Sequence, residues 1–269
     1  MHTQAGQRGR KALWLVCVLA VGVATANRGL AAGKSRSRKE AARAMARTER
    51  AIAKMRRSKR PSRSLGTFRD GRLVNALELP VTDLFGYRVR YPKRQTHYGA
   101  DRMVFGLMTL GVRMRLLCGE AGQFDVGDIS AKEGGKLSPH ITHQMGLDVD
   151  LGLYVTDPKG KPLSNRMVTF DEKGWSKDKS LRFDVRRNWW LVASMIENRH
   201  FAKIRCILLA DWLKKLLLDY AERRLRTLSN PDSIKRQKDL IRQAEKLVRQ
   251  PKSSPHANHY HVSLKQTDD

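Results

Sequence analysis

The sequence predicts an α+β fold in which a small mixed or antiparallel sheet is flanked by helices. Residues 101–117 carry apolar side chains at spacings of three and four, which favours a helix against a core, and residues 147–155 alternate as a strand does. Helical and strand patterns follow one another without a regular strand–helix–strand repeat. With 269 residues, of which 41% are hydrophobic, the chain can bury one substantial core and does not require two folded domains.

The chain begins with the pattern of an export signal. Arg8, Arg10 and Lys11 precede an uncharged run over residues 12–26, which ends in small residues. The run is shorter than the roughly 20 apolar residues that a membrane-spanning helix needs. We therefore predict a signal peptide over residues 1–26 and no transmembrane segment in the mature chain. The alternative is an uncleaved membrane anchor.

Residues 27–64 are predicted to form a basic, low-complexity arm. Residues 34–63 contain 13 Lys and Arg against Glu40 and Glu49, with few large apolar side chains, so we expect a mobile or partly helical segment. The arm either attracts polyanions or serves as a solvated tether, and its composition does not separate the two. The whole chain carries a net charge of +27, which favours anionic partners: nucleic acid, anionic lipid or the acidic polymers of a cell envelope.

Residues 65–269 are predicted to form the folded domain. Short apolar runs and strict alternation indicate strands, apolar positions recurring every three or four residues indicate helices, and paired glycines indicate a loop. Besides the two segments above, the expected elements are loops and brief strands over residues 73–91, a strand over 123–130, a loop over 131–138, a helix over 188–198, a buried strand over 203–209, helices over 211–224 and 233–249, and a closing strand over 259–264.

Two cysteines remain once the predicted signal is removed, Cys118 and Cys206. In an oxidising compartment they can pair, or they can be two separate buried thiols. Neither belongs to a Cys-x-x-Cys motif, so a thiolate metal site is not expected.

Five of the eight histidines lie in two short segments. His143 precedes the strand that carries Asp150, and His259 and His261 alternate on the last strand, so that both project to one face. A zinc ion held by His143, Asp150 and His261 would have three protein ligands and an open position for water, whose pKa it would lower to about 7. His259, with a pKa expected near the working range, is the candidate general base. Asp148 is interpreted as a supporting or structural carboxylate. The alternative to a metal site is that the histidines near the end of the chain have no functional role.

The two motifs, His-x-x-His-Gln-x-Gly-Leu-Asp-Val-Asp over residues 140–150 and His-x-x-His-x-His-Val over residues 256–262, resemble those of the penicillin-insensitive murein endopeptidases. These are zinc peptidases related to lysostaphin-type enzymes and D-Ala-D-Ala carboxypeptidases. The resemblance covers about residues 98–150 and the final strand. It implies the following roles: zinc ligands His143, Asp150 and His261, catalytic histidine His259, and additional active-site histidines His140 and His256.

The resemblance also implies a zinc peptidase domain over residues 65–269 that hydrolyses the D-Ala–meso-diaminopimelate cross-bridge of peptidoglycan in the periplasm. Peptidoglycan is then the substrate, the basic arm is a candidate for binding anionic envelope polymers, and no nucleic acid is expected. One alternative is a zinc D,D- or L,D-carboxypeptidase that trims stem peptides. Such relatives usually carry a Glu shortly before the final ligand, where residues 255–258 read Pro-His-Ala-Asn. The other alternative is a non-enzymatic exported protein that binds polyanions.

Overall fold

The computed structural model describes residues 30–201, 203–252 and 254–266. The predicted signal peptide therefore lies outside the described residues. By its internal contacts the chain divides into two units, Met1–Arg43 and Ala44–Asp269. Within the described residues, no helix combines the length and the apolar character needed to cross a bilayer.

Helix α1 (Leu30–Ser58) occupies most of the predicted basic arm. From Ala44 onward this helix belongs to the larger unit. Ile52 is 2% exposed within the core, Ala51 and Met55 pack against that core, and Glu49 forms an ion pair of 2.6 Å with Arg199. The second half of α1 is thus a packed helix and not a solvated tether, because one face of it carries enough apolar surface to be buried.

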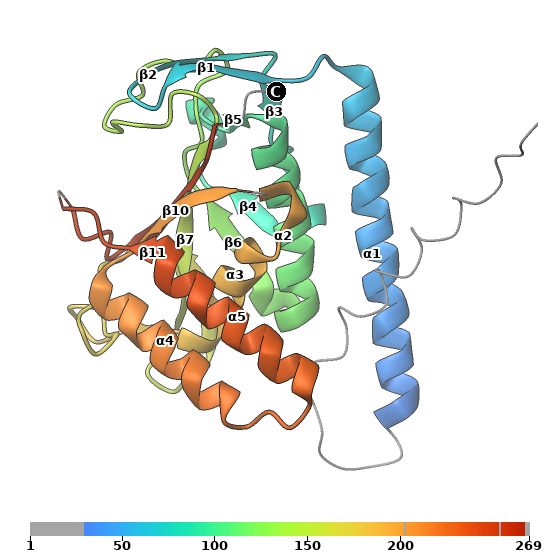
Figure 1. The fold of residues 1–269 in the computed structure, drawn as a ribbon, viewed down its shortest axis with the longest axis vertical. Helices are drawn as coiled ribbons and strands as arrows, with labels where there is room; N and C mark the ends of the chain where they lie inside the picture. The colour runs from blue at the N-terminus through green and yellow to red at the C-terminus, as the bar shows by residue number, and fades with distance from the viewer. Residues whose placement is uncertain (1–29, 202, 253, 267–269) are drawn as a thin grey trace, which may run out of the picture. The chain divides into compact units, whose positions relative to one another are not determined.

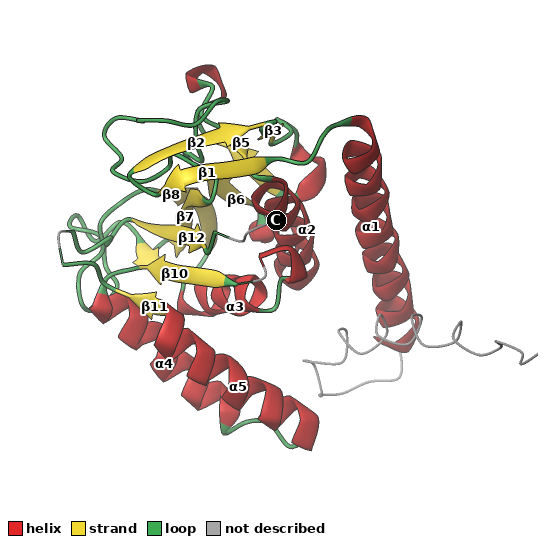
Figure 2. Ribbon diagram, turned by 45° about the horizontal axis from the view of Figure 1, so that its top comes forward, coloured by secondary structure: helices red, strands yellow, loops and turns green. Residues whose placement is uncertain are grey.

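The centre of the larger unit is an eight-stranded mixed sheet (Figures 1 and 2). Six strands follow the order β11-β10-β12-β7-β6-β4, and β8 and β9 both pair with β7. The pairs β4–β6 and β10–β11 are parallel, and the others are antiparallel. The strands are β4 (Tyr87–Val89), β6 (Phe124–Val126), β7 (Asp148–Thr156), β8 (Pro162–Arg166), β9 (Arg182–Phe183), β10 (Ile204–Leu208), β11 (Val248–Arg249) and β12 (His259–Leu264). The predicted α+β class is confirmed.

Four helices accompany the sheet, close to their predicted positions: α2 (Asp101–Cys118), α3 (Val185–Ile196), α4 (Asp211–Leu225) and α5 (Pro231–Leu247). Side chains cap two of them, with Asp184 accepting from the backbone N–H of Arg187 and Asn230 from that of Ser233. In both ribbon views α4 and α5 lie side by side near the β10–β11 edge of the sheet. The apolar pattern of α2 is interrupted by a glycine at position 106. A larger residue does not fit there, because a Cβ at Gly106 would lie 2.1 Å from the ring of Phe201.

Short elements form the end of the unit that lies away from α4 and α5 in Figures 1 and 2. A hairpin joins β1 (Arg63–Thr67) to β2 (Asp70–Val74), and β3 (Leu77–Glu78) pairs with β5 (Tyr98–Gly99). The sequence predicted brief strands over part of this stretch, without their pairing. Strands of two to five residues give too little periodicity to be located by pattern.

Cys118 and Cys206 are both free thiols, so of the two possibilities for these cysteines the structure contains separate thiols. Cys206 is buried in β10, and burial raises the pKa of the Cys118 thiol to about 11. A thiol with a raised pKa carries little thiolate at neutral pH and is a poor nucleophile.

The packing of α1 can be tested at one residue. Replacing Ile52 by Ala removes buried apolar volume and should lower the free energy of unfolding by about 2–5 kcal/mol, measured by urea denaturation. The matched control is Lys54→Ala, two residues away on the exposed face, which should change the free energy of unfolding by no more than about 0.5 kcal/mol. Equal stabilities of the two variants would contradict the packing of α1 described above.

Candidate metal centre

The histidines of the last strand meet the carboxylates of β7 through strand pairing. β12 runs antiparallel to β7, with His261 opposite Asp150, Ser263 opposite Asp148 and His259 opposite Gly152. Directly opposed residues project to the same face of a sheet, and alternate residues of one strand share that face. The pairing register therefore brings the end of the chain to a site begun more than a hundred residues earlier.

Three side-chain atoms converge at this point. His143 Nε2 lies 3.1 Å from His261 Nδ1 and 3.3 Å from Asp150 Oδ1, and His261 Nδ1 lies 3.1 Å from Asp150 Oδ1. All three residues are buried. Tetrahedral ligands at 2.0–2.1 Å from a zinc ion are separated by about 3.3–3.4 Å. The three atoms thus have the spacing and the donor chemistry of one face of a tetrahedral site.

His143 is held by the loop that leads into β7. Its backbone has a φ of 64°, in the left-handed region, and its ring Nδ1 lies 2.8 Å from the carbonyl oxygen of Ile129. Since a carbonyl only accepts, this bond places the proton on Nδ1 and leaves the lone pair of Nε2 facing the other two ligand atoms. Left-handed backbone is uncommon outside glycine, and such strain is typical of functional sites.

Asp148 supports the cluster from behind. Its Oδ1 lies 3.1 Å from His261 Nε2, on the side of the ring away from His143, and its Oδ2 accepts from the backbone N–H of His143 at 3.3 Å. This carboxylate–histidine arrangement orients a metal-binding imidazole. The interpretation of Asp148 as a supporting carboxylate agrees with these contacts.

The charges of the cluster are strongly coupled. Burial lowers the pKa of His261, but Asp148 and Asp150 outweigh it and raise the pKa to about 9. Burial raises the pKa of Asp150, yet the facing histidines, His143 first, hold it well below its usual value of 3.8. At neutral pH the metal-free cluster therefore contains two carboxylates and a protonated His261.

His140 lies next to this triangle. One ligand atom each of His140, His143 and Asp150 all lie within 4.8 Å of one another, so these three residues can also hold a metal ion. His140 Nδ1 is 3.7 Å from Asp150 Oδ2, which is longer than any side of the His261 triangle. Its Nε2 lies 3.0 Å from Asp128 Oδ2, so His140 bridges the two carboxylates.

Sequence reasoning missed Asp128. This residue is 4% exposed and also forms an ion pair of 3.0 Å with Arg94. Asp128 stands alone in a short segment without a motif, and Arg94 belongs to a surface loop. The contacts of Asp128 with Arg94 and His140 become visible only in the folded structure, where the segments that carry these three residues meet.

His259 and His256 also lie next to the cluster. His259 Nε2 lies 3.6 Å from Asp150 Oδ1, and its Nδ1 lies 2.6 Å from Asn258 Oδ1. The ring of His256 is 4.9 Å from that of His259, and its backbone has a φ of 45°. Burial lowers the pKa of His259 to about 4. The expectation of a pKa near neutrality is therefore wrong, because this ring is taken out of water.

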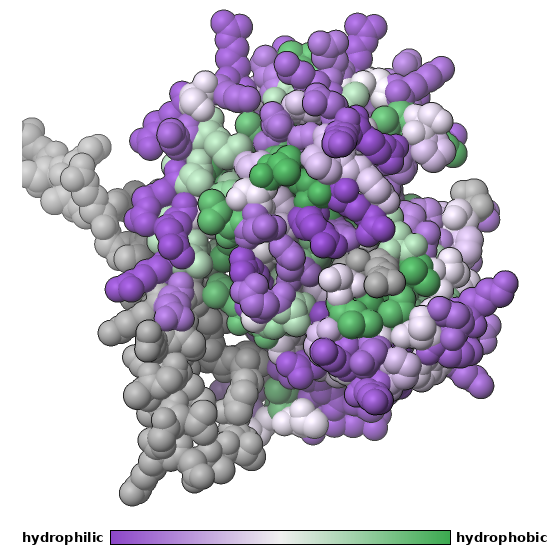
Figure 3. All heavy atoms as spheres, turned by 180° about the vertical axis from the view of Figure 1, so that it is seen from behind, coloured by the Kyte–Doolittle hydropathy of each residue, from purple (hydrophilic) through white to green (hydrophobic). Residues whose placement is uncertain are grey.

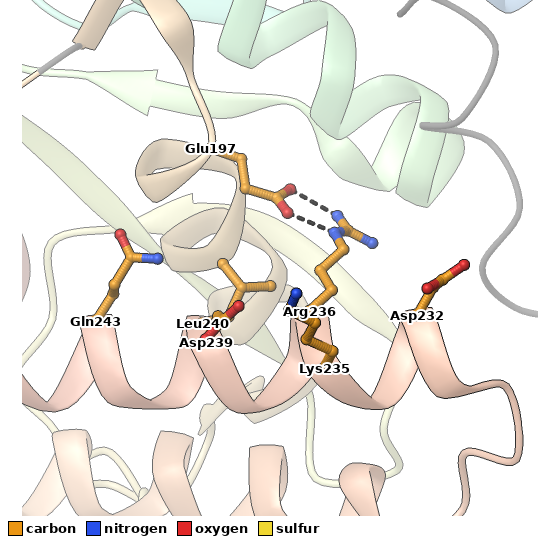
Figure 4. Close-up of a pocket in the computed structure, with 7 residues that line it drawn as sticks. All are labelled: Glu197, Asp232, Lys235, Arg236, Asp239, Leu240 and Gln243. Atoms are coloured by element: carbon orange, nitrogen blue, oxygen red, sulfur yellow. Dashed lines mark hydrogen bonds and ion pairs between the residues drawn. The ribbon is translucent and has the colours of Figure 1, made fainter.

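A hollow elsewhere in the molecule has a different character. It has a volume of about 290 Å³ and lies between α5 and the end of α3 (Figure 4). Glu197 pairs there with Arg236 and also with Arg113 of α2, so one carboxylate ties three helices together. The hollow is lined by residues that include neither histidine nor cysteine: Glu197, Asp232, Lys235, Arg236, Asp239, Leu240 and Gln243. We interpret this hollow as a structural ion-pair site.

A family profile described as penicillin-insensitive murein endopeptidase matches residues 64–205, which is just over half of the chain. The chain belongs to the penicillin-insensitive murein endopeptidase family. The match includes Arg94, Asp128, His140, His143 and Asp150 and ends before β12. The predicted family is thus confirmed, and the histidines of β12 join the site through the strand pairing.

Two curated members of this family are similar to the chain. The penicillin-insensitive murein endopeptidase of Haemophilus influenzae is 32% identical over 128 residues, which cover 42% of this chain and 43% of that protein. The protein of the same name from Pectobacterium atrosepticum is 30% identical over 93 residues, covering 34% of this chain and 32% of its own length. The chain matches less than half the length of these relatives. Neither alternative function receives support from these comparisons.

The coupling at His261 predicts a pH-dependent metal affinity. A metal must displace the His261 proton at any pH below about 9, so the apparent affinity for zinc should fall about tenfold for each unit that the pH drops between 8 and 6. Titration of the metal-free protein against a competing zinc chelator measures this slope. Asp148→Asn should lower the pKa of His261 and flatten the slope. A zinc affinity that does not change with pH in the wild-type protein would contradict the protonated state of His261.

Proposed function

We propose that this protein is a zinc metallopeptidase that hydrolyses the D-Ala–meso-diaminopimelate cross-bridge of peptidoglycan. The observation that carries the proposal is the convergence of His143, Asp150 and His261 in a chain of the murein endopeptidase family. Two imidazoles and a carboxylate suit zinc better than the harder cations, which prefer oxygen ligands alone.

These three residues are the proposed zinc ligands. A bound zinc ion would supply Lewis-acid chemistry, lowering the pKa of water and polarising a carbonyl oxygen. His143 and His261 each present the nitrogen that their supporting acceptors, the carbonyl of Ile129 and the carboxylate of Asp148, leave facing the site. We assign His140 to a supporting position, because its Nε2 is engaged by Asp128.

His259 is the proposed general base. Its lowered pKa keeps the ring neutral at any pH above about 4, and donation from Nδ1 to the amide oxygen of Asn258 leaves the lone pair of Nε2 toward Asp150. In hydrolysis, water adds to the scissile carbonyl, the C–N bond breaks, and the leaving amine gains the proton that the water lost. His259 is positioned to take that proton and pass it on. His256, whose ring neighbours that of His259, is proposed to help position the substrate.

The deciding experiment is digestion of purified, cross-linked muropeptides, read by mass spectrometry. Dimers should become monomers, penicillin should not inhibit because the proposed mechanism has no serine to acylate, and phenanthroline should abolish hydrolysis until zinc is restored. Trimming of stem peptides with the cross-links intact would favour the carboxypeptidase alternative. Hydrolysis that continues after complete removal of zinc would contradict the proposed zinc-dependent mechanism.

His259→Ala separates catalysis from metal binding. The substitution should lower kcat about 10²- to 10⁴-fold, as expected for loss of a general base, while the zinc content stays at one ion per chain. Metal analysis together with muropeptide kinetics makes the comparison. A variant with wild-type kcat would remove His259 from the mechanism, and a variant without zinc would make it a ligand.

We further propose export to the periplasm and binding of anionic envelope polymers through α1. Arg47, Arg50, Lys54 and Arg57 are all exposed and follow one another at helical spacings of three, four and three, opposite the buried Ile52. Like charges at such spacings destabilise a helix slightly, and an anionic partner would relieve this repulsion. The surface is also strongly polar: in Figure 3 hydrophilic side chains cover most of the face in view, with hydrophobic ones in small groups between them.

The charge stripe is tested by replacing Arg47, Arg50, Lys54 and Arg57 together with Gln. Co-sedimentation with insoluble, polymer-bearing cell-wall sacculi should weaken at least tenfold at low salt, and the difference should shrink as salt is raised. The matched control removes four exposed lysines from loops: Lys159, Lys161, Lys173 and Lys177. Equal weakening in both variants would mean that net charge, and not the stripe on α1, governs binding.

A further inference from the structure

A surface loop approaches the metal centre through Asp128. Residues 91–96 follow β4 and include the short helix η4 (Pro92–Arg94). The carbonyl oxygen of Thr96 accepts from the backbone N–H groups of Ile129 and Ser130, at 2.7 and 3.1 Å. The loop is therefore fixed to the segment that carries Asp128 and that provides the carbonyl acceptor for His143.

Asp128 joins this loop to His140 of the histidine cluster. Its Oδ2 lies 3.0 Å from Arg94 Nη1 and 3.0 Å from His140 Nε2. The guanidinium and the imidazole share one oxygen atom, so these two nitrogens lie at most about 6 Å apart. The backbone of Asp128 is also tied to the site, since its carbonyl oxygen accepts from the N–H of Asp150 at 3.0 Å.

Arg94 keeps a large part of its side chain in solvent. Its side chain is 43% exposed, whereas that of Asp128 is 5% exposed. The guanidinium packs with its Cζ 5.4 Å from the ring centre of Tyr91, itself a partly exposed residue. A guanidinium has five N–H donors in one plane, so donation to Asp128 leaves an edge for a second acceptor.

We propose that Arg94 binds a carboxylate of the substrate next to the scissile bond. The assignment rests on the proposed function. A diaminopimelate residue acylated on one amino group keeps a carboxylate on the carbon that bears that nitrogen, within a few bonds of the carbonyl that is attacked. Asp128 orients the guanidinium, which can then pair with this carboxylate through two parallel hydrogen bonds. The same Asp128 orients His140, so substrate binding and the histidine cluster share one anchor.

The surroundings of Arg94 favour a carboxylate over a sugar or an apolar group. Tyr91 is contacted by two guanidinium groups, those of Arg90 and Arg94, both with Cζ at 5.4 Å from the ring centre. Arg90 shares the buried carboxylate of Asp125 with Arg88, and Arg94 pairs with the carboxylate of Asp128. Guanidinium groups therefore outnumber the carboxylates that pair with them here, so an additional anion is electrostatically favourable beside Arg94.

The experiment compares two muropeptide dimers that differ only at this group, one with the diaminopimelate carboxylate free and one with it as a carboxamide. The wild-type enzyme should cleave the acid dimer with a kcat/KM about 10- to 100-fold higher, as expected for a charge-assisted pair. Arg94→Gln should bring the ratio to within about threefold of one, mainly through a higher KM for the acid dimer. Arg94→Lys keeps the positive charge but cannot form two parallel hydrogen bonds with a carboxylate, so it should give an intermediate ratio of the two kcat/KM values.

Arg88→Gln is the matched control. Arg88 is 48% exposed and pairs with the buried Asp125 at 2.7 Å, a carboxylate outside the histidine cluster. This variant should keep the wild-type ratio of the two substrates. The ratio is the informative readout, because loss of a structural contact would lower both rates together.

The outcomes separate the two proposals. Equal cleavage of both dimers by the wild-type enzyme would overturn the role of Arg94 and leave the proposed function standing. An equal fall of both rates in Arg94→Gln would also overturn it, and would assign Arg94 to positioning Asp128 and His140. Cleavage of neither dimer by the zinc-loaded wild-type enzyme would overturn the proposed function and this assignment with it.

Discussion

The antiparallel register of β7 and β12 is the constraint on which the site depends. A slip of one residue would turn His259 and His261 to the opposite face of the sheet and leave Asp148 and Asp150 buried without their imidazole partner. Both carboxylates are nearly inaccessible to water, and an unpaired buried charge is among the most unfavourable features a fold can contain. The pairing that brings the candidate metal ligands together therefore also provides partners for the buried carboxylates of β7 in the middle of the sheet. Site and fold are stabilised by one set of contacts.

The charge balance of this cluster gives a physical reason to expect a divalent cation. Asp148 and Asp150 are held ionised by their neighbours, and the single proton on His261 offsets only one of the two negative charges. Exchange of that proton for a doubly charged ion brings the sum of these three groups to zero, in a region that excludes water. The supporting contacts also agree with this exchange, because His143 and His261 each have a fixed acceptor on the far side of the ring. A metal ion bound at this candidate site would therefore require little reorganisation of the proposed ligands.

Much of this could be predicted from the sequence, and the failures have physical causes. The helix at residues 101–118 and the strand at residues 148–156 give strong periodic signals, and the two histidine motifs name the residues that converge. The pairing of β12 with β7 could only be inferred from the chemistry of those motifs, since the residue pattern of a six-residue strand does not indicate which other strand it pairs with. In the basic arm the composition is dominated by charge, so the apolar face of α1 formed by Ala51, Ile52 and Met55 gives only a weak signal in the sequence. The pKa of His259 depends on burial, which no local pattern reports.

Asp128 is the instructive omission, because its importance depends on three segments that meet only in the folded protein. It lies between the loop of Arg94, the histidine loop and the start of β7: its carboxylate contacts the guanidinium of Arg94, the imidazole of His140 and the hydroxyl of Thr96, and its backbone carbonyl accepts from the N–H of Asp150. A buried carboxylate that accepts several hydrogen bonds is held in one position, and it in turn holds His140 of the histidine cluster and Arg94 of the surface loop. Arg94 is consequently fixed relative to the candidate metal ligands although it belongs to an exposed loop. A loop held in this way can recognise a substrate without the entropic cost that ordering a mobile loop would add.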